Sequence, residues 1–376
     1  MNITTTLLSA TLLAAASTSA FAQGSVTLYG ILSEGVAWVN NDGGHASAKT
    51  VTGPNQNNRV GFRISEDLGS GNRVVATLEN GFDITSGKLQ QGGRMFGRQA
   101  YVGLSNDHWG TLTLGRQYDM FWDYFTQISS AAATSGLADH PGDSDNLIGS
   151  WRYSNTVKYV SPTVNGMNAE AMYSFSNAAG AFTQNRAFGG GIGYSRGPVM
   201  LAAAYVELDQ PGTLNANGAV SDDFQGASFL MFRSSPLNSA IGTLKQRNAG
   251  VGGYYDFSAH LRLNAMIDTI RYAYRDGTNF RLDNYDVSID YKLARSLVLG
   301  AAYVFSAGKY GGISANPHWH TAAVSLDYFL SKRTDVFIFD DFQRVSGPHA
   351  VAALYLDSPS STGSQNMVVI GMRHKF

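Results

Sequence analysis

The sequence contains no cysteine among its 376 residues, which excludes disulfide frameworks, thiolate metal sites and cysteine nucleophiles. It is also poor in charge. Charged residues make up 15% of the chain, against roughly 25% in typical soluble domains. Lysine and arginine (27) nearly balance aspartate and glutamate (28), so no excess of positive charge favours nucleic acid as a partner.

Long apolar runs are missing as well. After residue 22, no stretch approaches the roughly 20 apolar residues that a membrane-spanning helix needs, and the longest, such as residues 197–206, reach about half of that length. The chain is nevertheless 44% hydrophobic, which argues against disorder. The composition therefore disfavours a helical membrane protein and a disordered chain, and it is unusual for a soluble protein.

The N-terminus carries the features of an export signal. A mostly apolar region spans residues 7–16, and residues 20–22 (AFA) form the small-x-small pattern of a cleavage site. The segment before Leu7 contains no lysine or arginine, which departs from the usual pattern and leaves a buried N-terminal helix as the alternative. We expect a signal peptide at residues 1–22 and one mature domain at residues 23–376.

Alternation of apolar and polar residues is the main pattern of the mature chain, and it is typical of strands with one buried face. It is clear in residues 261–268 (LRLNAMID) and again in residues 284–291 (NYDVSIDY). Residues 297–305 are apolar on both faces, which we interpret as contact with a neighbouring subunit. Such runs predict sixteen strands, at residues 26–39, 58–67, 72–82, 94–105, 110–117, 151–161, 167–175, 186–196, 198–208, 245–257, 259–274, 280–293, 296–306, 317–329, 333–344 and 366–376.

The predicted connections alternate between short and long. Residues 68–71 and 195–197 are short turns, whereas residues 118–150, 209–244 and 345–365 form long loops. This asymmetry and an even strand number are typical of outer-membrane barrels. Hydrocarbon offers no hydrogen-bond partner, so a spanning sheet must close on itself. Sixteen strands also enclose a space too wide for side chains to fill, which favours a barrel with lipid outside and water inside over a soluble sandwich, propeller or repeat array.

Several short segments occur in a fixed order from residue 25 to the C-terminus. They are SVTLYG at 25–30, GFR at 61–63 with SEDLG at 65–69, FGRQAYVGL at 96–104, LGRQYD at 114–119, HPGD at 140–143, SKRTD at 331–335 and GMRHKF at 371–376. Together they resemble the general diffusion porins of Gram-negative β-proteobacteria, of the Burkholderia and Neisseria type. Residues 209–244 match this family least well.

The resemblance implies an all-β fold, a 16-stranded antiparallel transmembrane β-barrel with a long third loop folded into the pore. It implies passive diffusion of ions and small hydrophilic solutes through a water-filled homotrimer in the cell outer membrane, with no enzymatic activity and no cofactor. The other expected partners are outer-membrane lipid, lipopolysaccharide and the barrel assembly machinery. Phe376 would be the assembly signal that this machinery recognises, or else an aromatic residue of the lipid-facing girdle.

The loop at residues 118–150 is too long for a hairpin connection, and loops of this length are usually functional or disordered. The resemblance places it in the pore, where it would present the carboxylates of Asp119, Asp123, Asp139, Asp143 and Asp145. Opposite it, the resemblance implies a basic wall of Arg63, Arg98 and Arg152.

Three more arginines, Arg59, Arg94 and Arg116, would belong to this wall or to its rim. Arginine suits such a wall because it stays charged at any working pH. The alternative is that all of these side chains are merely solvated. The sequence leaves the sign of the ion selectivity open, and of the two signs we favour anions.

Three further patterns predict no site. His318 and His320 share a strand face but have no carboxylate nearby in sequence. Residues 143–146 (DSDN) resemble part of a calcium loop, yet the glycine and the terminal glutamate of an EF-hand are missing. The glycines at residues 189–193 lack the strand-to-helix context of a dinucleotide site and suggest a closely packed stretch of wall.

Other functions remain open at this point. A substrate-specific outer-membrane channel would differ from a general porin by a few side chains that the sequence does not position. An outer-membrane enzyme would need a nucleophile or an acid–base set at the rim, and no Ser–His constellation stands out. A barrel adhesin or structural anchor would lack an open lumen. Single-channel conductance separates both from a porin.

Overall fold

The computed structural model describes residues 24–134, 137–224 and 229–376. The predicted signal peptide at residues 1–22 lies outside these residues. The strands of the described chain are β1 (Gly24–Asp42), β2 (His45–Thr52), β3 (Arg59–Gly69), β4 (Asn72–Gly81), β5 (Gln99–Asn106), β6 (Gly110–Gln117), β7 (Tyr153–Val160), β8 (Met167–Ser174), β9 (Arg186–Arg196), β10 (Val199–Asp209), β11 (Thr243–Asp256), β12 (Leu261–Tyr274), β13 (Asn279–Ala294), β14 (Leu297–Gly311), β15 (His318–Phe329), β16 (Thr334–Ser346) and β17 (Ser364–Lys375).

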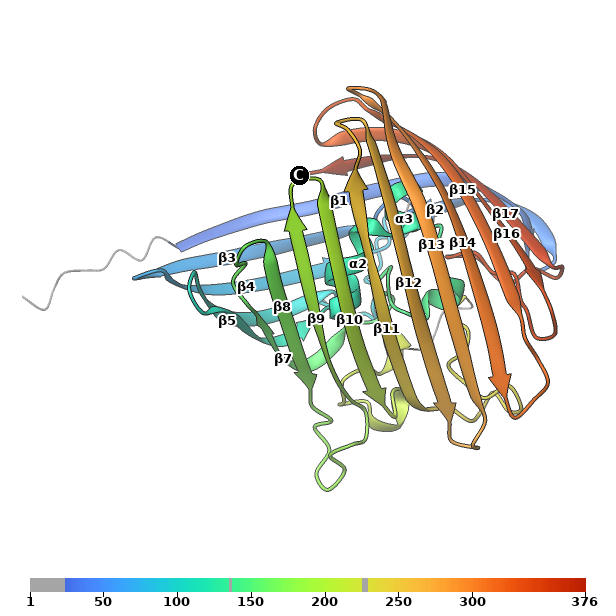
Figure 1. Cartoon of the computed structure of the whole chain (residues 1–376), viewed down its shortest axis with the longest axis horizontal. Helices are drawn as coiled ribbons and strands as arrows, with labels where there is room; N and C mark the ends of the chain where they lie inside the picture. Colours follow the sequence, from blue (N-terminus) through green and yellow to red (C-terminus); the bar gives the residue numbers. More distant parts are fainter. Residues whose placement is uncertain (1–23, 135–136, 225–228) are drawn as a thin grey trace, which may run out of the picture.

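The strands form one closed antiparallel sheet (Figure 1). Each strand from β3 to β17 pairs with the next, and β17 pairs with β1. The other edge of β1 pairs with β3 over residues 24–31 and with β2 over residues 34–42. Because β2 and β3 share one place in the ring, the 17 described strands make a barrel of sixteen, which confirms the prediction.

Two details differ from the predicted strands. The sequence analysis missed β2, because its residues HASAKTVT have no continuous apolar face and lie largely exposed. A turn at Gly43 and Gly44, both with positive φ, folds β2 back onto the end of β1. The predicted strand at residues 94–105 begins only at Gln99, because the preceding residues lie in an irregular loop.

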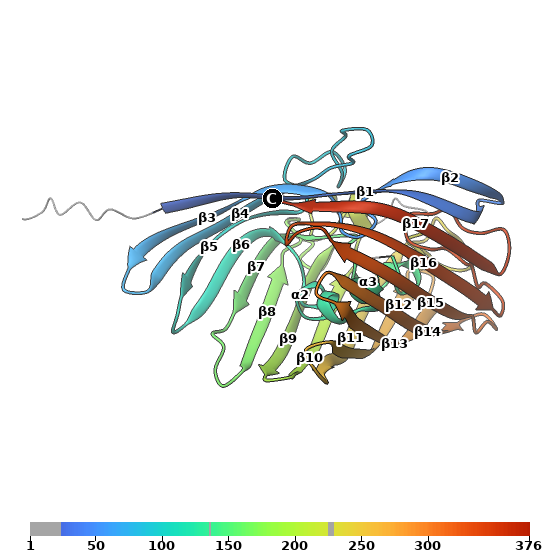
Figure 2. The same cartoon turned by 90° about the horizontal axis from the view of Figure 1, so that it is seen from above.

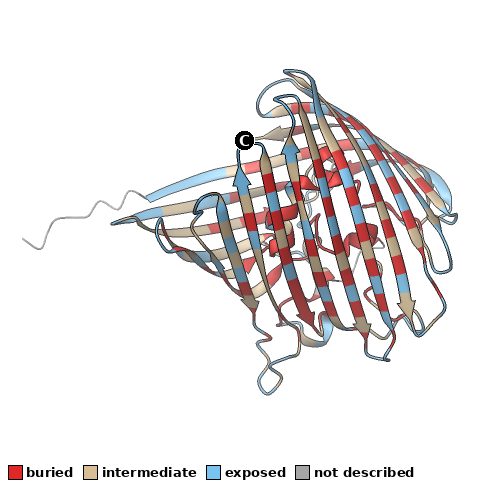
Figure 3. Cartoon of the chain, viewed as in Figure 1, coloured by how far each residue is buried: buried red, intermediate tan, exposed pale blue. Residues whose placement is uncertain are grey.

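The alternation predicted from the sequence orients the side chains as expected. On β12, Asn264, Met266 and Asp268 are buried in the interior, whereas Ile267 is 52% exposed on the outside. Figure 3 shows this as alternating bands of buried and exposed residues along the strands. Exposed apolar side chains recur around the barrel, Ile370 on β17 among them, and lipid is the environment in which they are stable.

Short helices lie in the connections: α2 (Met120–Phe125), η1 (Thr126–Ile128), α3 (Ser130–Thr134), η2 (Pro141–Asp143), η3 (Thr213–Asn215) and η4 (Asp222–Phe224). No helix of the described chain is long and apolar enough to cross a membrane. The first four belong to the β6–β7 loop (residues 118–152). Helix α2 packs against β9 to β11 and α3 against β13 to β15 (Figure 2).

This packing explains two sequence features. The inward glycines Gly191 and Gly193 leave room for the ring of Tyr124 on α2, since an added Cβ at either would come within 2.6 Å of that ring. Helix α3 covers Gly300 and contacts the inner face of β14. The second apolar face of residues 297–305 is therefore turned toward α3, and our assignment of that face to a neighbouring subunit was wrong. Parts of the interior are apolar because the loop packs there.

Candidate pore constriction

Four arginines converge at the long-loop ends of neighbouring strands. They are Arg59 at the start of β3, Arg98 just before β5, Arg116 near the end of β6 and Arg152 just before β7. All four are buried, with Arg98 fully enclosed. We call these four residues the basic cluster. The predicted wall residues Arg98, Arg116 and Arg152 are thus brought together, and Arg59 joins them.

Tyr118, the first residue of the β6–β7 loop, lies among these side chains. The guanidinium carbons of Arg98 and Arg152 lie 5.8 Å and 4.9 Å from the centre of its ring. Arg152 Nη2 also donates a 2.9 Å hydrogen bond to the Tyr118 hydroxyl. Since cations are attracted to the face of an aromatic ring, Tyr118 helps to hold two like charges close together.

Arg98 is paired with Glu79 on β4. Its Nε donates a 2.7 Å hydrogen bond to Glu79 Oε1, and the Tyr29 hydroxyl donates to the other carboxylate oxygen at 2.8 Å. Within the described part of the chain, Nη1 and Nη2 of Arg98 and Nε of Arg152 are buried without a hydrogen-bond partner. The basic cluster therefore keeps free donors in the interior of the barrel.

Arg116 is held by several acceptors. Its Nε donates to the Gly97 carbonyl at 2.8 Å and its Nη1 donates to Ser154 Oγ at 2.8 Å. Its Nη2 forms an ion pair with Asp223, which lies on η4 in the β10–β11 loop (residues 210–242). Arg59 Nε donates to the Asn57 carbonyl at 3.0 Å.

Arg63 lies apart from the basic cluster. It shares the inner face of β3 with Arg59 but is four residues, about 13 Å, closer to the short-turn end. It is exposed, and its guanidinium carbon lies 4.2 Å from the centre of the Tyr29 ring. Arg94 in the β4–β5 loop donates a 2.7 Å hydrogen bond to the Gln91 carbonyl.

The five loop aspartates occupy different environments. Asp119 caps the N-terminus of α2 by accepting a 3.0 Å hydrogen bond from the Trp122 N–H, and burial raises its pKa to about 6. Asp123 is exposed and forms an ion pair with Lys158 on β7. The remaining three, Asp139, Asp143 and Asp145, are buried near β12.

Tyr355, in the β16–β17 loop (residues 347–363), lies between the buried loop aspartates and the basic cluster. Burial raises its pKa, and the carboxylates of Asp143 and Asp139 raise it further, while Arg152 and Arg98 act in the opposite direction. Its ring packs edge to face against Phe229 of the β10–β11 loop, with 4.5 Å between ring centres. Three loops therefore meet beside the basic cluster.

Three cavities follow one another through the interior. The first, of about 320 Å³, is lined by Arg152, Asp223 and Tyr355 and reaches Asn57. The second, of about 260 Å³, also touches Asn57 and lies between the β6–β7 loop and the start of β3.

Three cations line this second cavity, namely Arg59, Arg373 and Lys375, with no carboxylate among its described lining residues. The third cavity, of about 690 Å³, shares Asn55 and Arg373 with the second and reaches the short-turn end of the barrel. These shared lining residues show that the three cavities adjoin one another between the loop end and the turn end.

Several of these residues escaped the sequence analysis. Glu79 and Asp223 carried no local signal, because each finds its arginine only through the fold. Arg373 and Lys375 did carry a local signal, because the alternating pattern of β17 places both on the polar, inward face of that strand. His318 and His320 lie near β14, where the Tyr303 hydroxyl contacts His320 Nδ1 at 2.6 Å.

The C-terminal residue takes part in closing the barrel. Phe376 exchanges two main-chain hydrogen bonds of 3.1 Å with Gly30 on β1. Its side chain is 40% exposed, and an added Cβ at Gly30 would overlap its ring. The placement allows a lipid-facing ring and leaves its role in assembly a prediction.

A sixteen-stranded barrel with an apolar outer face and adjoining charged cavities in its interior is a transmembrane channel. The chain belongs to the Gram-negative porin family, which it matches over residues 9–347. It is an outer-membrane porin for passive diffusion, as the sequence analysis predicted.

Relatives and solved structures agree with this assignment. The chain is similar to an outer membrane porin protein of Bordetella pertussis, with 29% identity over 402 aligned residues that cover 99% of each chain. The fold of the anion-selective porin from Comamonas acidovorans matches with a TM-score of 0.76 at 22% identity, over 94% of this chain and 100% of that one. The trimer form of OmpT from Vibrio cholerae matches with a TM-score of 0.68 at 13% identity, over 94% and 99% of the two chains. The relatives are channels rather than enzymes.

Proposed function

We propose that this porin prefers anions and that the preference is set where the β6–β7 loop narrows the channel beside the basic cluster. The lining of the second cavity carries the proposal, since Arg59 and Lys375 contribute positive charge there without a carboxylate among the described lining residues. The third cation, Arg373, is paired with Asp335 and Asp327. One fixed cation about 6 Å from a permeating anion contributes about 3 kcal/mol at an effective dielectric constant of about 20. Several such charges favour anions over cations of the same size.

The free donor of Arg152, which lines the first cavity, supports the same proposal. A buried donor without a partner costs about 1–3 kcal/mol, so a partner that supplies an acceptor is stabilised there. Guanidinium groups bind carboxylates and phosphates through two parallel hydrogen bonds. Small solutes that carry these groups are therefore the favoured cargo among hydrophilic compounds.

The aspartates of the β6–β7 loop have separate roles in this proposal. Asp123 is the carboxylate exposed to the channel, and Asp119 serves as the cap of α2. Asp139, Asp143 and Asp145 anchor the loop near β12, away from the permeating ion. Arg63 acts below the constriction, on the short-turn side.

The test is the reversal potential of the purified channel in a planar bilayer under a potassium chloride gradient. Wild type is expected to be anion-selective. Arg59→Ala and Lys375→Ala should each lower the chloride-to-potassium permeability ratio by about twofold or more. Arg281→Ala is the matched control, because it removes the same charge from the outward face of β13. A cation-selective wild type, or equal shifts in all three variants, would contradict the proposal.

We further propose a homotrimer without enzymatic activity, exported through the periplasm by a signal peptide at residues 1–22. The trimer form of the Vibrio cholerae protein with the same fold supports the assembly. Light scattering of the detergent-solubilised porin should give three chains per particle. Lipopolysaccharide and the barrel assembly machinery remain expected partners, and mass spectrometry of the mature protein should find Gln23 at its N-terminus.

A further inference from the structure

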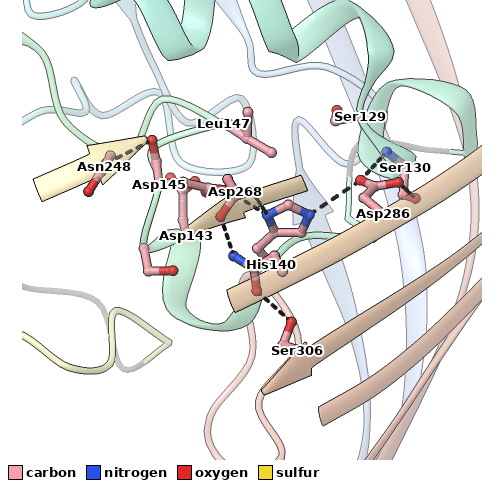
Figure 4. A network of polar contacts seen from close by, with 12 residues as sticks. Ser129, Ser130, His140, Asp143, Asp145, Leu147, Asn248, Asp268, Asp286 and Ser306 are labelled. Atoms are coloured by element: carbon pink, nitrogen blue, oxygen red, sulfur yellow. Dashed lines mark hydrogen bonds and ion pairs between the residues drawn. The ribbon is translucent and has the colours of Figure 1, made fainter. Parts of the chain in front are cut away.

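A second charged site lies near the tip of the β6–β7 loop, away from the basic cluster. Residues 139–145 contain three aspartates and one histidine, and all four of these side chains are buried. Gly142 and Asp143 adopt positive φ values of 69° and 40°, which turns this segment sharply toward β12 and β13. Figure 4 shows His140 between carboxylates of the loop and of the barrel wall.

Both nitrogens of the His140 ring are directed at carboxylates. Nδ1 donates a 2.5 Å hydrogen bond to Asp145 Oδ2 and lies 3.2 Å from Asp268 Oδ2 on β12. Nε2 lies 3.3 Å from Asp286 Oδ2 on β13. Burial lowers the pKa of His140, but Asp145 and Asp268 outweigh this effect and raise the pKa well above its ordinary value.

The other side of Asp145 holds a group of three carboxylates. One carboxylate oxygen each of Asp139, Asp143 and Asp145 lies within 4.8 Å of the other two. Asp143 is fixed in place by the main-chain N–H groups of Ile148 at 3.1 Å and Ser150 at 3.0 Å. Within the described chain, Oδ1 of Asp139 and Oδ1 of Asp145 have no hydrogen-bond partner. Two of the three buried carboxylates thus each keep an oxygen without a hydrogen-bond partner.

The surrounding charges do not compensate this group. Five carboxylates gather here, those of Asp139, Asp143, Asp145, Asp268 and Asp286. Among the residues that the structure describes, the facing cations are His140 and Arg233, whose Nη2 donates to the carbonyls of Gly142 and Asp143 at 3.3 Å and 3.2 Å. Isolated buried carboxylates are strongly unfavourable, so protons or a further cation must neutralise the excess. Burial and the neighbouring Asp145 carboxylate together raise the pKa of Asp143 to about 7.

We propose that Asp139, Asp143 and Asp145 bind one divalent cation of the calcium type. Calcium takes oxygen ligands at about 2.3–2.6 Å, so two of its ligands are at most about 5 Å apart, which the three carboxylates satisfy. Calcium also accepts irregular geometry and completes its shell with water, whereas magnesium demands a near-ideal octahedron. A transition metal would recruit the imidazole, but Nδ1 of His140 already donates to Asp145 and Nε2 lies 3.3 Å from the Asp286 carboxylate.

The sequence analysis set residues 143–146 aside because the glycine and glutamate of an EF-hand are missing. In the folded chain a third carboxylate comes instead from Asp139, four residues before Asp143. It lies close to the carboxylates of Asp143 and Asp145. The ion would neutralise the loop tip where it touches β12 and β13, and it would thereby fasten the β6–β7 loop to the wall. This site is independent of the proposed ion preference.

The test uses porin refolded from inclusion bodies in detergent, which removes lipopolysaccharide as a source of bound calcium. Equilibrium dialysis against calcium chloride should give one tightly bound Ca²⁺ per chain. Asp139→Asn and Asp145→Asn should each lower the affinity at least tenfold. The control Asp107→Asn removes an exposed carboxylate from a short turn and should bind as wild type does. Wild type that binds no calcium, or variants that bind it equally well, would overturn the proposal.

If an aspartate variant does not fold, calcium binding can still be tested by thermal unfolding of the wild-type protein. Calcium should raise the unfolding midpoint by several degrees over an EGTA-treated sample, because a ligand that binds only the folded state stabilises it. A midpoint that is the same in calcium and in EGTA would also overturn the proposal.

Discussion

Asp223 forms an ion pair with the guanidinium of Arg116 and also accepts a 3.3 Å hydrogen bond from the main-chain N–H of Arg152. The carboxylate comes from the β10–β11 loop, 107 positions away from Arg116 in the sequence. It therefore neutralises one of the four arginines of the basic cluster. The other loop that reaches the cluster contributes Tyr355, which carries no charge when protonated.

The first prediction concerns this carboxylate. Asp223→Asn removes a negative charge from the first cavity and keeps the size of the side chain, so we expect the chloride-to-potassium permeability ratio to rise by about twofold. Reversal potentials in a salt gradient measure the change. Asp340→Asn is the control, because Asp340 lies exposed on β16. A shift toward potassium in the Asp223 variant would show that its carboxylate does not face the permeating ion.

The second prediction separates the stability of the Arg98–Glu79 pair from its effect on transport. Arg98→Met leaves the Glu79 carboxylate buried with only the Tyr29 hydroxyl as a donor, which should lower the free energy of unfolding by about 3–5 kcal/mol. It should also lower the anion preference. Urea unfolding in lipid vesicles and reversal potentials measure the two effects.

Adding Glu79→Gln to this variant removes the uncompensated charge. The double variant should regain most of the stability, because no buried carboxylate is left unpaired. Its anion preference should stay low, since the positive charge of Arg98 is not restored. Recovery of both properties would mean that Arg98 serves the fold alone.

The third prediction concerns the glycines of β9. Gly191→Val would force a methyl-bearing carbon within 2.6 Å of the Tyr124 ring, so we expect a loss of about 1–3 kcal/mol in unfolding free energy from overpacking. Gly190→Val is the control, because its nearest neighbour would be the Glu170 carbonyl oxygen at 3.4 Å. Combining Gly191→Val with Tyr124→Ala should restore stability. Failure of that rescue would mean that the glycine is needed for the strand itself.

The barrel could be predicted from the sequence because its signal is local. Side chains of a strand alternate in direction, so lipid outside and polar groups inside leave a period of two that needs no knowledge of distant residues. The pattern failed at β2, whose exposed residues have no apolar face to reveal it. It was also misread at residues 297–305, where the inner face is apolar because α3 covers it.

The candidate site was less accessible to sequence reasoning. The resemblance implied the arginines of the wall and its rim. Their partners Glu79 and Asp223 lie on other elements and carry no periodic signal. The loop aspartates looked equivalent in sequence. Their separation into a helix cap, an exposed carboxylate and a buried group follows from how the loop folds against β12, which no local pattern encodes.

The fourth prediction is a pH dependence of stability that originates in Asp119. Burial raises the pKa of Asp119 to about 6 from its ordinary 3.8, so the folded chain holds this proton more tightly than the unfolded chain does. The stabilisation of the folded chain by this proton is therefore fully present below pH 4. It falls as the pH rises toward 6 and is lost above pH 6. A tenfold difference in proton affinity between the two states is equivalent to about 1.4 kcal/mol, so the loss amounts to about 3 kcal/mol.

Asp119→Asn should abolish this dependence and should be more stable than wild type above pH 6. Asparagine still caps α2, so the helix is retained. Unfolding free energies of both proteins from pH 4 to pH 7, measured without calcium, provide the test. Parallel pH profiles for wild type and variant would assign the proton to another group.

The fifth prediction separates two roles of the C-terminal residue. Phe376→Ala keeps both main-chain hydrogen bonds to Gly30, so the ring of strands can still close and refolding into vesicles of purified lipid should proceed as in wild type. In cells the folded amount in the outer membrane should fall severalfold if the assembly machinery recognises the aromatic ring. The heat-modifiable band on unboiled gels measures folded barrel in both settings. Equal losses in vesicles and in cells would instead assign the ring to packing against Gly30, which it touches.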